Sequence, residues 1–480
     1  MRIQQYKRII QILETLSEAQ AAGLYANCQE SALGIGQYIE ENVGTETCTV
    51  SELETYCELL YRVSIGEEDI NVLNAGLDVV KASLMSEFYP RLEIAFISNN
   101  ASMADSMESI YLAAKADEEC DPYFISVPFH ERNSNGTLGK MNYEGAEHNK
   151  AIEITNYSEY DMATRRPDII FTNNPYDDSN FVTCVQPDYF TYSLKKHTEM
   201  LCFVPYFVPH ISDGAYMAHG VRPLRFDFIA ATSEDDYQFY RSAGIKSDVA
   251  VLGCAKLDRL FHAMQERPDI PGSWQSKIPE IRQKKTLALV SSLGVFANQS
   301  ELYLQRLEEY ISTIEMRNDI ALIFRPHPLM EKTINAMFDL EVSTRYNTLL
   351  SRIEQGSFGV VDREVDFIPT IIYCDAFAGE MYSSLARMYA LTGKPIFEMV
   401  LDRPQKNNII RGGELKYSYT ETEEFSLAVF LDRFVSGDIP PYDRKQEKYN
   451  RSLYANADGT AGKKIYEYVK RKAYDLGGIV

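Results

Sequence analysis

Basic residues are scarce in this sequence. Its 480 residues include 48 lysines and arginines against 69 aspartates and glutamates, which gives a formal net charge of −21 at pH 7. Proteins that bind nucleic acid need clustered positive charge, and docking on anionic lipid through charge alone needs it as well. The composition therefore disfavours both kinds of partner.

Long apolar runs and paired cysteines are also missing. No segment reaches the roughly 18 uninterrupted apolar residues that suggest a membrane-spanning helix. Residues 1–20 are charged and amphipathic, unlike a secretory signal. The eight cysteines are scattered, with no C-x-x-C pair and no zinc or haem spacing. We therefore expect reduced thiols, no bound metal or other cofactor, and a cytoplasmic location.

The chain is long enough for two or three domains, and its first part has a helical pattern. Ile9, Leu13 and Leu16 follow helical spacing, and a second apolar series follows Ser51, which we expect to cap its helix. We predict a helical region over residues 1–88, and nothing in it suggests chemistry.

Short apolar runs of strand length begin at residue 92. The run 92–98 precedes a polar loop and a helix, for which Ser102 and Asp105 form a capping signature. Further strand-like runs lie at 123–129, 167–173 and 200–207. Alternating strands and helices are typical of parallel α/β domains. They predict a first Rossmann-like domain over residues 89–244.

A second α/β series follows the first. Its strand-like runs lie at 248–253, 286–292, 319–326 and 376–379. We predict a second Rossmann-like domain over residues 245–423 and C-terminal helices over residues 424–480. Two such parallel-sheet domains should face a cleft, because open α/β sheets bind ligands at the carboxyl ends of their strands.

The segment ALIFRPHPLME, residues 321–331, places Arg325 and His327 directly after an apolar strand. The planar guanidinium of Arg325 suits phosphate, while His327 can donate a hydrogen bond to phosphate or move a proton. A loop that ends a strand, with a surface arginine and an incidental histidine, explains the pattern about as well.

The segment 374–395, CDAFAGEMYSSLARMYALTGKP, places Ser383 and Ser384 at the start of a helix. Unpaired amides at a helix N-terminus, with two hydroxyls beside them, form an anion site. The alternative is that Ser383 only caps the helix. The later Gly393 and Lys394 lack P-loop spacing and mark the end of the helix.

A third segment, VLGCAKLDRLF at 251–261, ends a strand at Gly253. Lys256 could face a phosphate and Asp258 a partner lysine, although an ordinary surface turn is nearly as good an explanation.

Polar loops follow two strands of the first domain and could hold a hydroxylated acceptor. Their asparagines are Asn99, Asn100, Asn173 and Asn174. Ordinary turn chemistry explains these loops about as well. His210 and His219 follow the strand at 200–207, where a lone histidine is more often structural than catalytic.

Together these segments resemble the CDP-glycerol glycerophosphotransferase family, which builds teichoic-acid-like polymers. FRPHP is similar to the family's R-x-H-P segment, and VLGCAKLD to its G-x-P-R/K-x-D segment. Residues 374–397 are similar to the segment that contains Tyr-Ser-Ser, here Tyr382, Ser383 and Ser384. The order and spacing agree over roughly residues 200–400. The resemblance implies a GT-B fold whose second domain holds most of the donor nucleotide.

Two family features differ in this sequence. The family's Trp-His-Gly-Thr-Pro loop, whose histidine is expected to act as general base, is absent as such, and the only tryptophan is Trp274. His210 and His219 are the nearest substitutes. The acidic position before Tyr-Ser-Ser is altered as well, because Glu380 and Met381 stand there.

The resemblance implies an enzyme that transfers glycerol phosphate, or a similar alditol phosphate, from a CDP-linked donor to a hydroxyl of a cell-wall or capsule glycan or polymer, with release of CMP. His327 would bind the donor diphosphate or assist departure of CMP, and His210 or His219 would take the acceptor proton. The residues implied to bind donor phosphates are Arg325, Lys256, Tyr382, Ser383 and Ser384. Further donor-site candidates are Gly253, Asp258 and Glu380.

Two alternatives stay open. One is a GT-B glycosyltransferase that uses a nucleotide sugar. The other is a non-catalytic homologue that binds nucleotide or acts as a scaffold. A lipid-linked acceptor would bring the protein to the inner face of the cell membrane as a peripheral protein.

Overall fold

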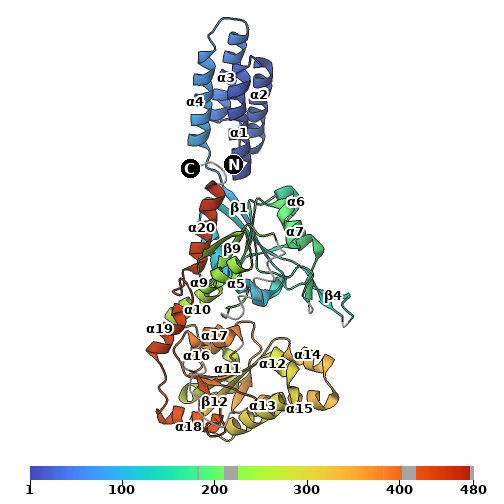
Figure 1. Ribbon diagram of the computed structural model, residues 1–480, viewed down its shortest axis with the longest axis vertical. Coiled ribbons are helices and arrows are strands. Elements are labelled where there is room, and N and C mark those ends of the chain that lie inside the picture. Colours follow the sequence, from blue (N-terminus) through green and yellow to red (C-terminus); the bar gives the residue numbers. More distant parts are fainter. Residues whose placement is uncertain (134, 181–182, 210–224, 382, 403–417, 476–480) are drawn as a thin grey trace.

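Four helices form the N-terminal part of the molecule. The computed structural model describes residues 1–133, 135–180, 183–209, 225–381, 383–402 and 418–475. Its first helices are α1 (Ile3–Ala21), α2 (Tyr25–Asn42), α3 (Cys48–Ser64) and α4 (Asn71–Glu87). Each buries an apolar stripe in a core that the four helices share. We call α1–α4 the N-terminal bundle; it stands at one end of the molecule (Figure 1).

The predicted helical region is therefore confirmed, but one of its boundaries was wrong. Ser51 was expected to cap a helix, whereas α3 begins at Cys48 and Thr47 is its N-cap. The Thr47 side chain accepts a hydrogen bond from the Val50 amide at 3.3 Å. Both residues are hydroxylated, so local chemistry alone does not separate the two caps.

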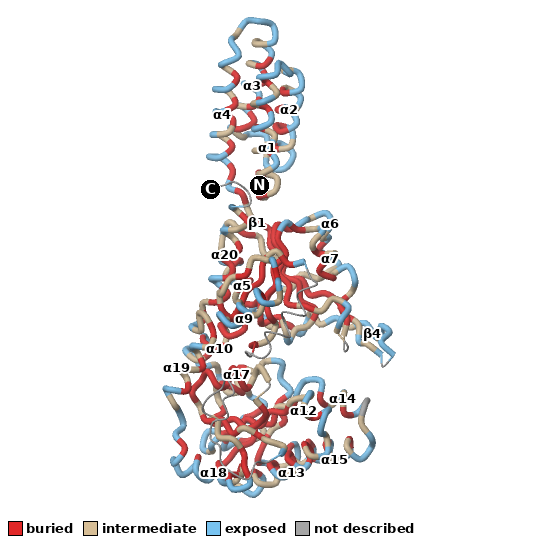
Figure 2. Tube along the Cα trace, viewed as in Figure 1, coloured by how far each residue is buried: buried red, intermediate tan, exposed pale blue. Residues whose placement is uncertain are grey.

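The first α/β domain is built on a parallel sheet of seven strands in the described part of the chain. The order is β10-β9-β8-β6-β1-β2-β5, and every neighbouring pair is parallel. The strands are β1 (Leu92–Ser98), β2 (Cys120–Ser126), β5 (Ile154–Asn156), β6 (Ile169–Thr172), β8 (Met200–Phe203), β9 (Phe228–Ala231) and β10 (Asp248–Val251). Two apolar cores cover the two faces of this sheet, as a parallel sheet requires (Figure 2).

Smaller elements complete this domain. An antiparallel sheet has the order β4-β3-β7, with β3 (Phe129–Arg132), β4 (Leu138–Asn142) and β7 (Thr183–Val185). The helices are α5 (Ala101–Lys115), α6 (Met162–Arg165), α7 (Thr191–Leu194) and α9 (Glu234–Ser242). Single 3₁₀ turns are η1 (Gly145–Glu147), η2 (Tyr157–Glu159), η3 (Pro187–Tyr189) and η4 (Lys195–His197).

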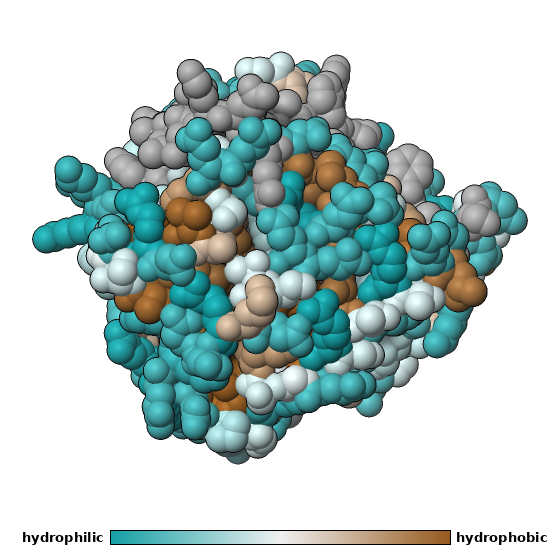
Figure 3. Space-filling view, turned by 90° about the horizontal axis from the view of Figure 1, so that it is seen from below, coloured by the Kyte–Doolittle hydropathy of each residue, from teal (hydrophilic) through white to brown (hydrophobic). Residues whose placement is uncertain are grey.

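The second α/β domain has a parallel sheet of six described strands in the order β13-β12-β11-β14-β15-β16. The strands are β11 (Lys285–Ser291), β12 (Ile320–Pro326), β13 (Gly359–Val361), β14 (Ala376–Gly379), β15 (Ile396–Glu398) and β16 (Tyr419–Thr420). Apolar cores again lie on both faces. On the end of this domain remote from the bundle, hydrophobic groups form separate patches among hydrophilic ones (Figure 3).

Helices surround the second sheet. Those that precede or follow its first strands are α10 (Asp258–Glu266), α11 (Gly272–Lys277), α12 (Leu293–Asn298), α13 (Ser300–Glu315), α14 (Met330–Met337) and α15 (Leu340–Gln355). The later ones are α16 (Ile368–Tyr373), α17 (Ser384–Ala390), α18 (Leu427–Ser436) and α19 (Arg444–Ser452), and the 3₁₀ turns are η5 (Ala255–Leu257) and η6 (Ile281–Gln283). The last helix, α20 (Ala461–Asp475), packs on the first domain. Within the described residues, no helix combines the length and apolarity needed to cross a membrane.

One strand lies in a different domain from the one predicted. Residues 248–253 were expected to open the second series, but β10 pairs in parallel with β9 and belongs to the first sheet. The chain crosses to the second domain only after β10, so the predicted division after residue 244 comes one strand too early. The last helix, α20, returns to the first domain, where Ile465 and Val469 join the core beside α5.

The two crossing segments of chain touch at Gly253. This glycine has φ +98°, and a Cβ atom there would lie 2.2 Å from the carbonyl oxygen of Ala455. Asn456 donates a side-chain hydrogen bond to the Leu252 carbonyl at 2.9 Å beside this contact. Close approach of two backbones therefore requires glycine here.

Candidate functional site

Arg325 and His327 lie at the carboxyl end of β12, as the sequence predicts. The Arg325 guanidinium, however, is engaged by the loop that follows the neighbouring strand β13. Its Nη1 atom lies 2.5 Å from the Asp362 carboxylate and its Nη2 donates to the Glu364 carbonyl at 2.6 Å. Arg325 thus organises the loop 362–366, and its predicted contact with donor phosphate stays a prediction.

His327 directly follows β12. Its amide donates to the Ser291 carbonyl at 3.1 Å, which ties it to the end of β11. Its Nδ1 accepts a hydrogen bond from the Leu329 amide at 3.2 Å, so the neutral ring carries its proton on Nε2. The residue is exposed, and partial desolvation of its ring by the neighbouring protein lowers its pKa. His327 is therefore a neutral hydrogen-bond donor at pH 7.

The segment between β14 and α17 brings the two domains together. Ser383 caps α17, because its Oγ accepts the Ala386 amide at 3.1 Å. The Ser384 Oγ accepts the amide of Val208 at 3.2 Å, and Arg387 donates to the Val208 carbonyl. Val208 follows β8 of the first sheet, so the carboxyl edges of both sheets meet at this point. Tyr382 lies outside the described residues.

Glu380 occupies an almost water-free position beside these serines. Its residue is 5% exposed, and its Oε1 has no hydrogen-bond partner among the described residues. Burial raises the pKa of this carboxyl to about 7, while its contact with the Tyr303 hydroxyl opposes the shift. The Tyr303 hydroxyl also accepts the Ser292 amide at 3.2 Å. Glu380 can consequently exchange a proton near neutral pH.

Lys256 and Asp258 have protein partners in the structure. The buried Lys256 ammonium pairs with the Asp105 carboxylate of α5, and it lies 5.3 Å from the ring centroid of Phe367. The Asp258 carboxylate accepts the amides of Ala461 and Gly462 at 3.1 and 2.7 Å, so it holds the first turn of α20. Lys256 thus holds α5, and Asp258 holds α20. Their predicted roles in the donor site stay predictions.

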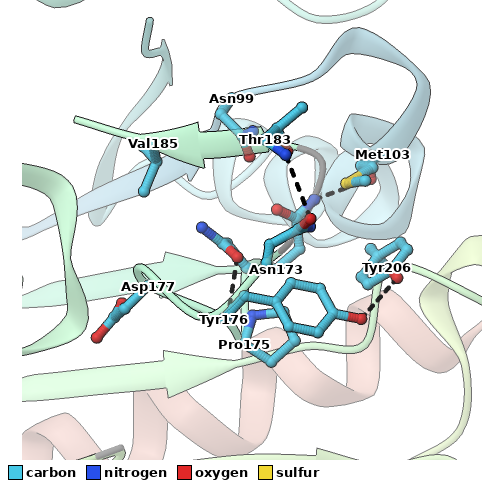
Figure 4. A pocket seen from close by; sticks show the side chains of 11 residues that line it. Asn99, Met103, Asn173, Pro175, Tyr176, Asp177, Thr183, Val185 and Tyr206 are labelled. Atoms are coloured by element: carbon cyan, nitrogen blue, oxygen red, sulfur yellow. Dashed lines mark hydrogen bonds between the residues drawn. The ribbon is translucent and has the colours of Figure 1, made fainter. Parts of the chain in front are cut away.

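The asparagines predicted to hold an acceptor gather at the carboxyl edge of the first sheet. Asn100 caps α5 by accepting the Ser102 amide at 2.9 Å, and Asn174 accepts the Tyr176 amide at 3.1 Å. Asn99, Asn173 and Asn174 line a small pocket (Figure 4). The pocket, which we call the asparagine pocket, is lined by Asn99, Met103, Asn173, Asn174, Pro175, Tyr176, Asp177, Asn180, Thr183, Val185 and Tyr206.

Several polar residues at this edge were not predicted. His148 is buried, and its Nε2 lies 3.2 Å from the Ser126 Oγ at the end of β2. Burial lowers the pKa of His148 to about 4, so the ring is neutral at pH 7. Ser126 ends β2 but lies in the middle of the predicted run 123–129, and His148 lies in a long loop with no pattern around it, so the sequence marked neither residue.

An ionic cluster between the domains was also missed. Arg259 of α10 contacts the Asp366 carboxylate at 2.6 Å, next to the buried Glu108, whose pKa burial raises. These partners are distant in sequence, and only the fold brings them together. The predicted histidines His210 and His219 lie outside the described residues. Within the described ranges, no group of three or more metal-ligating side chains is present.

Comparison with known proteins shows which solved structures have a similar fold. No protein-family model and no curated protein sequence matches this chain. A protein provisionally named UDP-N-acetylglucosamine 2-epimerase, from Listeria monocytogenes, has a similar structure, with TM-score 0.52 and 12% identity over 81% of this chain and 98% of that one. The wall teichoic acid polymerase TagF with CDPG gives TM-score 0.49 and 13% identity over 89% and 99% of the two chains.

A further similar structure is the UDP-GlcNAc 2-epimerase from Neisseria meningitidis bound to UDP-GlcNAc, with TM-score 0.48 and 12% identity over 79% of this chain and all of that one, 100%. At such low identity the likeness concerns the fold. The likeness to the Listeria monocytogenes structure, together with the two parallel sheets and the helices at both ends, shows that this chain has a GT-B-like fold.

Proposed function

We propose that this protein is a transferase with a nucleotide-linked donor, and that it moves glycerol phosphate, or a similar alditol phosphate, from a CDP-linked donor to a hydroxyl of a cell-wall or capsule glycan or polymer. The acceptor oxygen forms a bond to the donor phosphorus and loses its proton to a base. The bond from that phosphorus to the bridging oxygen breaks, and CMP leaves with the electron pair.

The observation that carries the proposal is the state of His327. A neutral ring whose Nδ1 is occupied keeps Nε2–H free to donate, and the His327 backbone is tied to the end of β11. Such a donor stabilises the negative charge that grows on the leaving CMP oxygen. Phosphoryl-type transfer depends mainly on positioning and charge stabilisation, which suits a site built from strand ends. The ordered resemblance of the three segments supports the CDP-linked donor.

Replacement of His327 by Ala should lower kcat/KM by about 10²–10³, the usual cost of one donor aimed at developing charge. The measurement is CMP release from CDP-glycerol with a glycan acceptor. His262→Ala is the matched control, because His262 is an exposed histidine of α10 in the same domain. Unchanged turnover in His327→Ala would contradict the assignment of His327.

Donor identity is tested by calorimetric titration with CDP-glycerol, CDP-ribitol, UDP-glucose and CMP. Selective binding of a CDP-alditol supports the proposal. Binding of UDP-glucose alone would instead favour a glycosyltransferase that uses a nucleotide sugar, and nucleotide binding without turnover on any acceptor would favour the non-catalytic alternative. A lipid-linked acceptor would place the protein at the inner membrane face, which sedimentation with acceptor-containing vesicles can measure.

A further inference from the structure

We propose that the asparagine pocket binds a hydroxyl-bearing edge of a neutral saccharide, so that the acceptor end is an uncharged sugar and not a polyol-phosphate chain. This inference rests on the proposed function, since it names the acceptor class of the same enzyme. It is drawn from the polar groups, charge and position of the pocket, which lies at the carboxyl ends of β1 and β6 (Figure 4).

Two buried amides in the pocket have unused hydrogen-bonding capacity. Asn99 is 8% exposed, and its side chain makes no hydrogen bond with a described residue. Asn173 is fully buried; its Nδ2 donates to the Met103 carbonyl at 2.9 Å, while its Oδ1 has no partner in the described part of the chain. Leaving the buried Asn173 Oδ1 without a partner costs about 1–3 kcal/mol. A ligand hydroxyl can donate to Asn173 Oδ1 and accept from the Asn99 amide, which satisfies both.

The charge of the pocket excludes a phosphate at this position. Among the described residues that line it there is no lysine or arginine, and the charged one is Asp177. The Asp177 carboxylate accepts the Thr191 amide at 2.8 Å and the Thr191 hydroxyl at 2.7 Å. Nearby, Arg132 is turned to the carbonyls of Gly136 and Asp178. A phosphate beside an aspartate with no facing cation would be repelled, whereas a neutral hydroxyl is not.

Two tyrosines complete a surface suited to sugars. The hydroxyl groups of Tyr176 and Tyr206 lie 2.8 Å apart, and their ring centroids lie 6.2 Å apart (Figure 4). Apolar ring faces combined with a few fixed polar groups are typical of small-molecule sites. The space open to the centre of a water-sized group is about 10 Å³, which is room for roughly one such group. The pocket therefore takes one hydroxyl, and the sugar ring lies outside it against the tyrosines.

The position of the pocket fits an acceptor site. Tyr206 is two residues from Val208, whose amide donates to Ser384 at the start of α17. Two residues of extended chain span at most about 7 Å. The asparagine pocket is thus joined through Tyr206 and Val208 to the segment predicted to bind the donor phosphates, and a sugar held there would extend toward that segment.

The test is saturation-transfer NMR with four neutral sugars, namely glucose, galactose, N-acetylglucosamine and maltose, and with two anions, glycerol 3-phosphate and inorganic phosphate. We expect saturation transfer to at least one neutral sugar and a Kd for it that rises tenfold or more in Asn99→Ala. That variant removes a side chain without internal hydrogen bonds, so its thermal unfolding should be nearly unchanged. Asn99→Asp, which keeps the side-chain shape, is the second variant if Asn99→Ala unfolds.

Asn347→Ala is the matched control, because Asn347 is an exposed asparagine on α15 of the second domain. Absence of saturation transfer to all four sugars overturns the inference. It is also overturned if Asn99→Ala leaves the Kd for the bound sugar unchanged, or if one of the anions binds and Asn99→Ala abolishes that binding. Titration of the same preparation with CDP-glycerol separates the two proposals. If CDP-glycerol binds but no sugar shows saturation transfer, only the acceptor inference is refuted. If a sugar binds but CDP-glycerol does not, only the proposed function is refuted.

Discussion

At the residue scale, Glu380 is a buried titratable group at the carboxyl edge of the second sheet. The carboxyl is buried beside Tyr303, and burial raises its pKa to about 7 from an ordinary value of 4.5. The folded protein therefore binds this proton more tightly than the unfolded chain does. Its stabilising effect is fully present below pH 4.5 and is lost as the pH rises through about 7, where the folded state must bury a charge.

Replacement of Glu380 by Gln removes the buried charge and should raise the free energy of unfolding at pH 8 by about 3 kcal/mol, with no gain at pH 4.5. Urea denaturation at a series of pH values measures the difference. Glu423→Gln is the control, because Glu423 is exposed, and it should give a flat difference. A gain in Glu380→Gln that is equal at both pH values would show that the carboxyl does not titrate in this range.

The sequence is enough to predict that these polar residues lie at the carboxyl edges of the sheets, but not which residues they contact. Strand ends follow from apolar runs, so the positions of Arg325, His327 and Glu380 at carboxyl edges could be predicted. The partners could not. Asp362 and Asp105 lie far in sequence from the cations they pair with, Arg325 and Lys256, and only the register of neighbouring strands and the packing of α5 bring them close.

At the scale of elements, the crossing between domains depends on Gly253. Its φ of +98° and the 2.2 Å approach of the Ala455 carbonyl leave no space for a Cβ atom. Replacement of Gly253 by Ala should lower the free energy of unfolding by about 3 kcal/mol or more, because the backbone strain adds to the clash. Thermal or urea unfolding gives the value.

Gly294→Ala is the matched control for this prediction. Gly294 lies in the helix α12, and nothing is found within 4 Å of the position where its Cβ would be. Alanine is favoured over glycine in a helix, so this variant should gain about 0.5–1 kcal/mol. Equal effects of the two substitutions would mean that the crossing segments do not touch in solution.

The same crossing explains which elements the sequence could not assign. Most strands of the two sheets are short apolar runs and were recognised from that pattern, but β5, β13 and β16 are only two or three residues long and were not predicted. Which sheet a strand joins, however, is set by pairing with strands distant in sequence. Nothing in the local sequence distinguishes β10, the edge strand of the first sheet, from β11, the first strand in chain order of the second sheet. The return of α20 to α5 is likewise fixed by Asp258, which holds the amides of Ala461 and Gly462.

At the scale of the whole molecule, the N-terminal bundle and the candidate site lie at opposite edges of the first sheet. Arg2 contacts Glu93, and the Ile3 amide donates to the Arg91 carbonyl at 3.0 Å, both at the amino end of β1. The asparagine pocket lies at the carboxyl end of the same strand. Seven strand residues separate the two ends, a distance of about 20 Å.

This separation predicts that the bundle stabilises the protein without shaping its ligand sites. Ile3 is fully buried in the core of the first domain, so Ile3→Ala should lower the free energy of unfolding by about 2–5 kcal/mol. The Kd for the donor nucleotide should stay within about twofold of its original value. Ile39→Ala makes the same truncation inside the bundle core and is the control. A large change in nucleotide affinity in Ile3→Ala alone would show that the amino edge of the sheet is coupled to the carboxyl edge, and the bundle would then be a regulatory element of the protein.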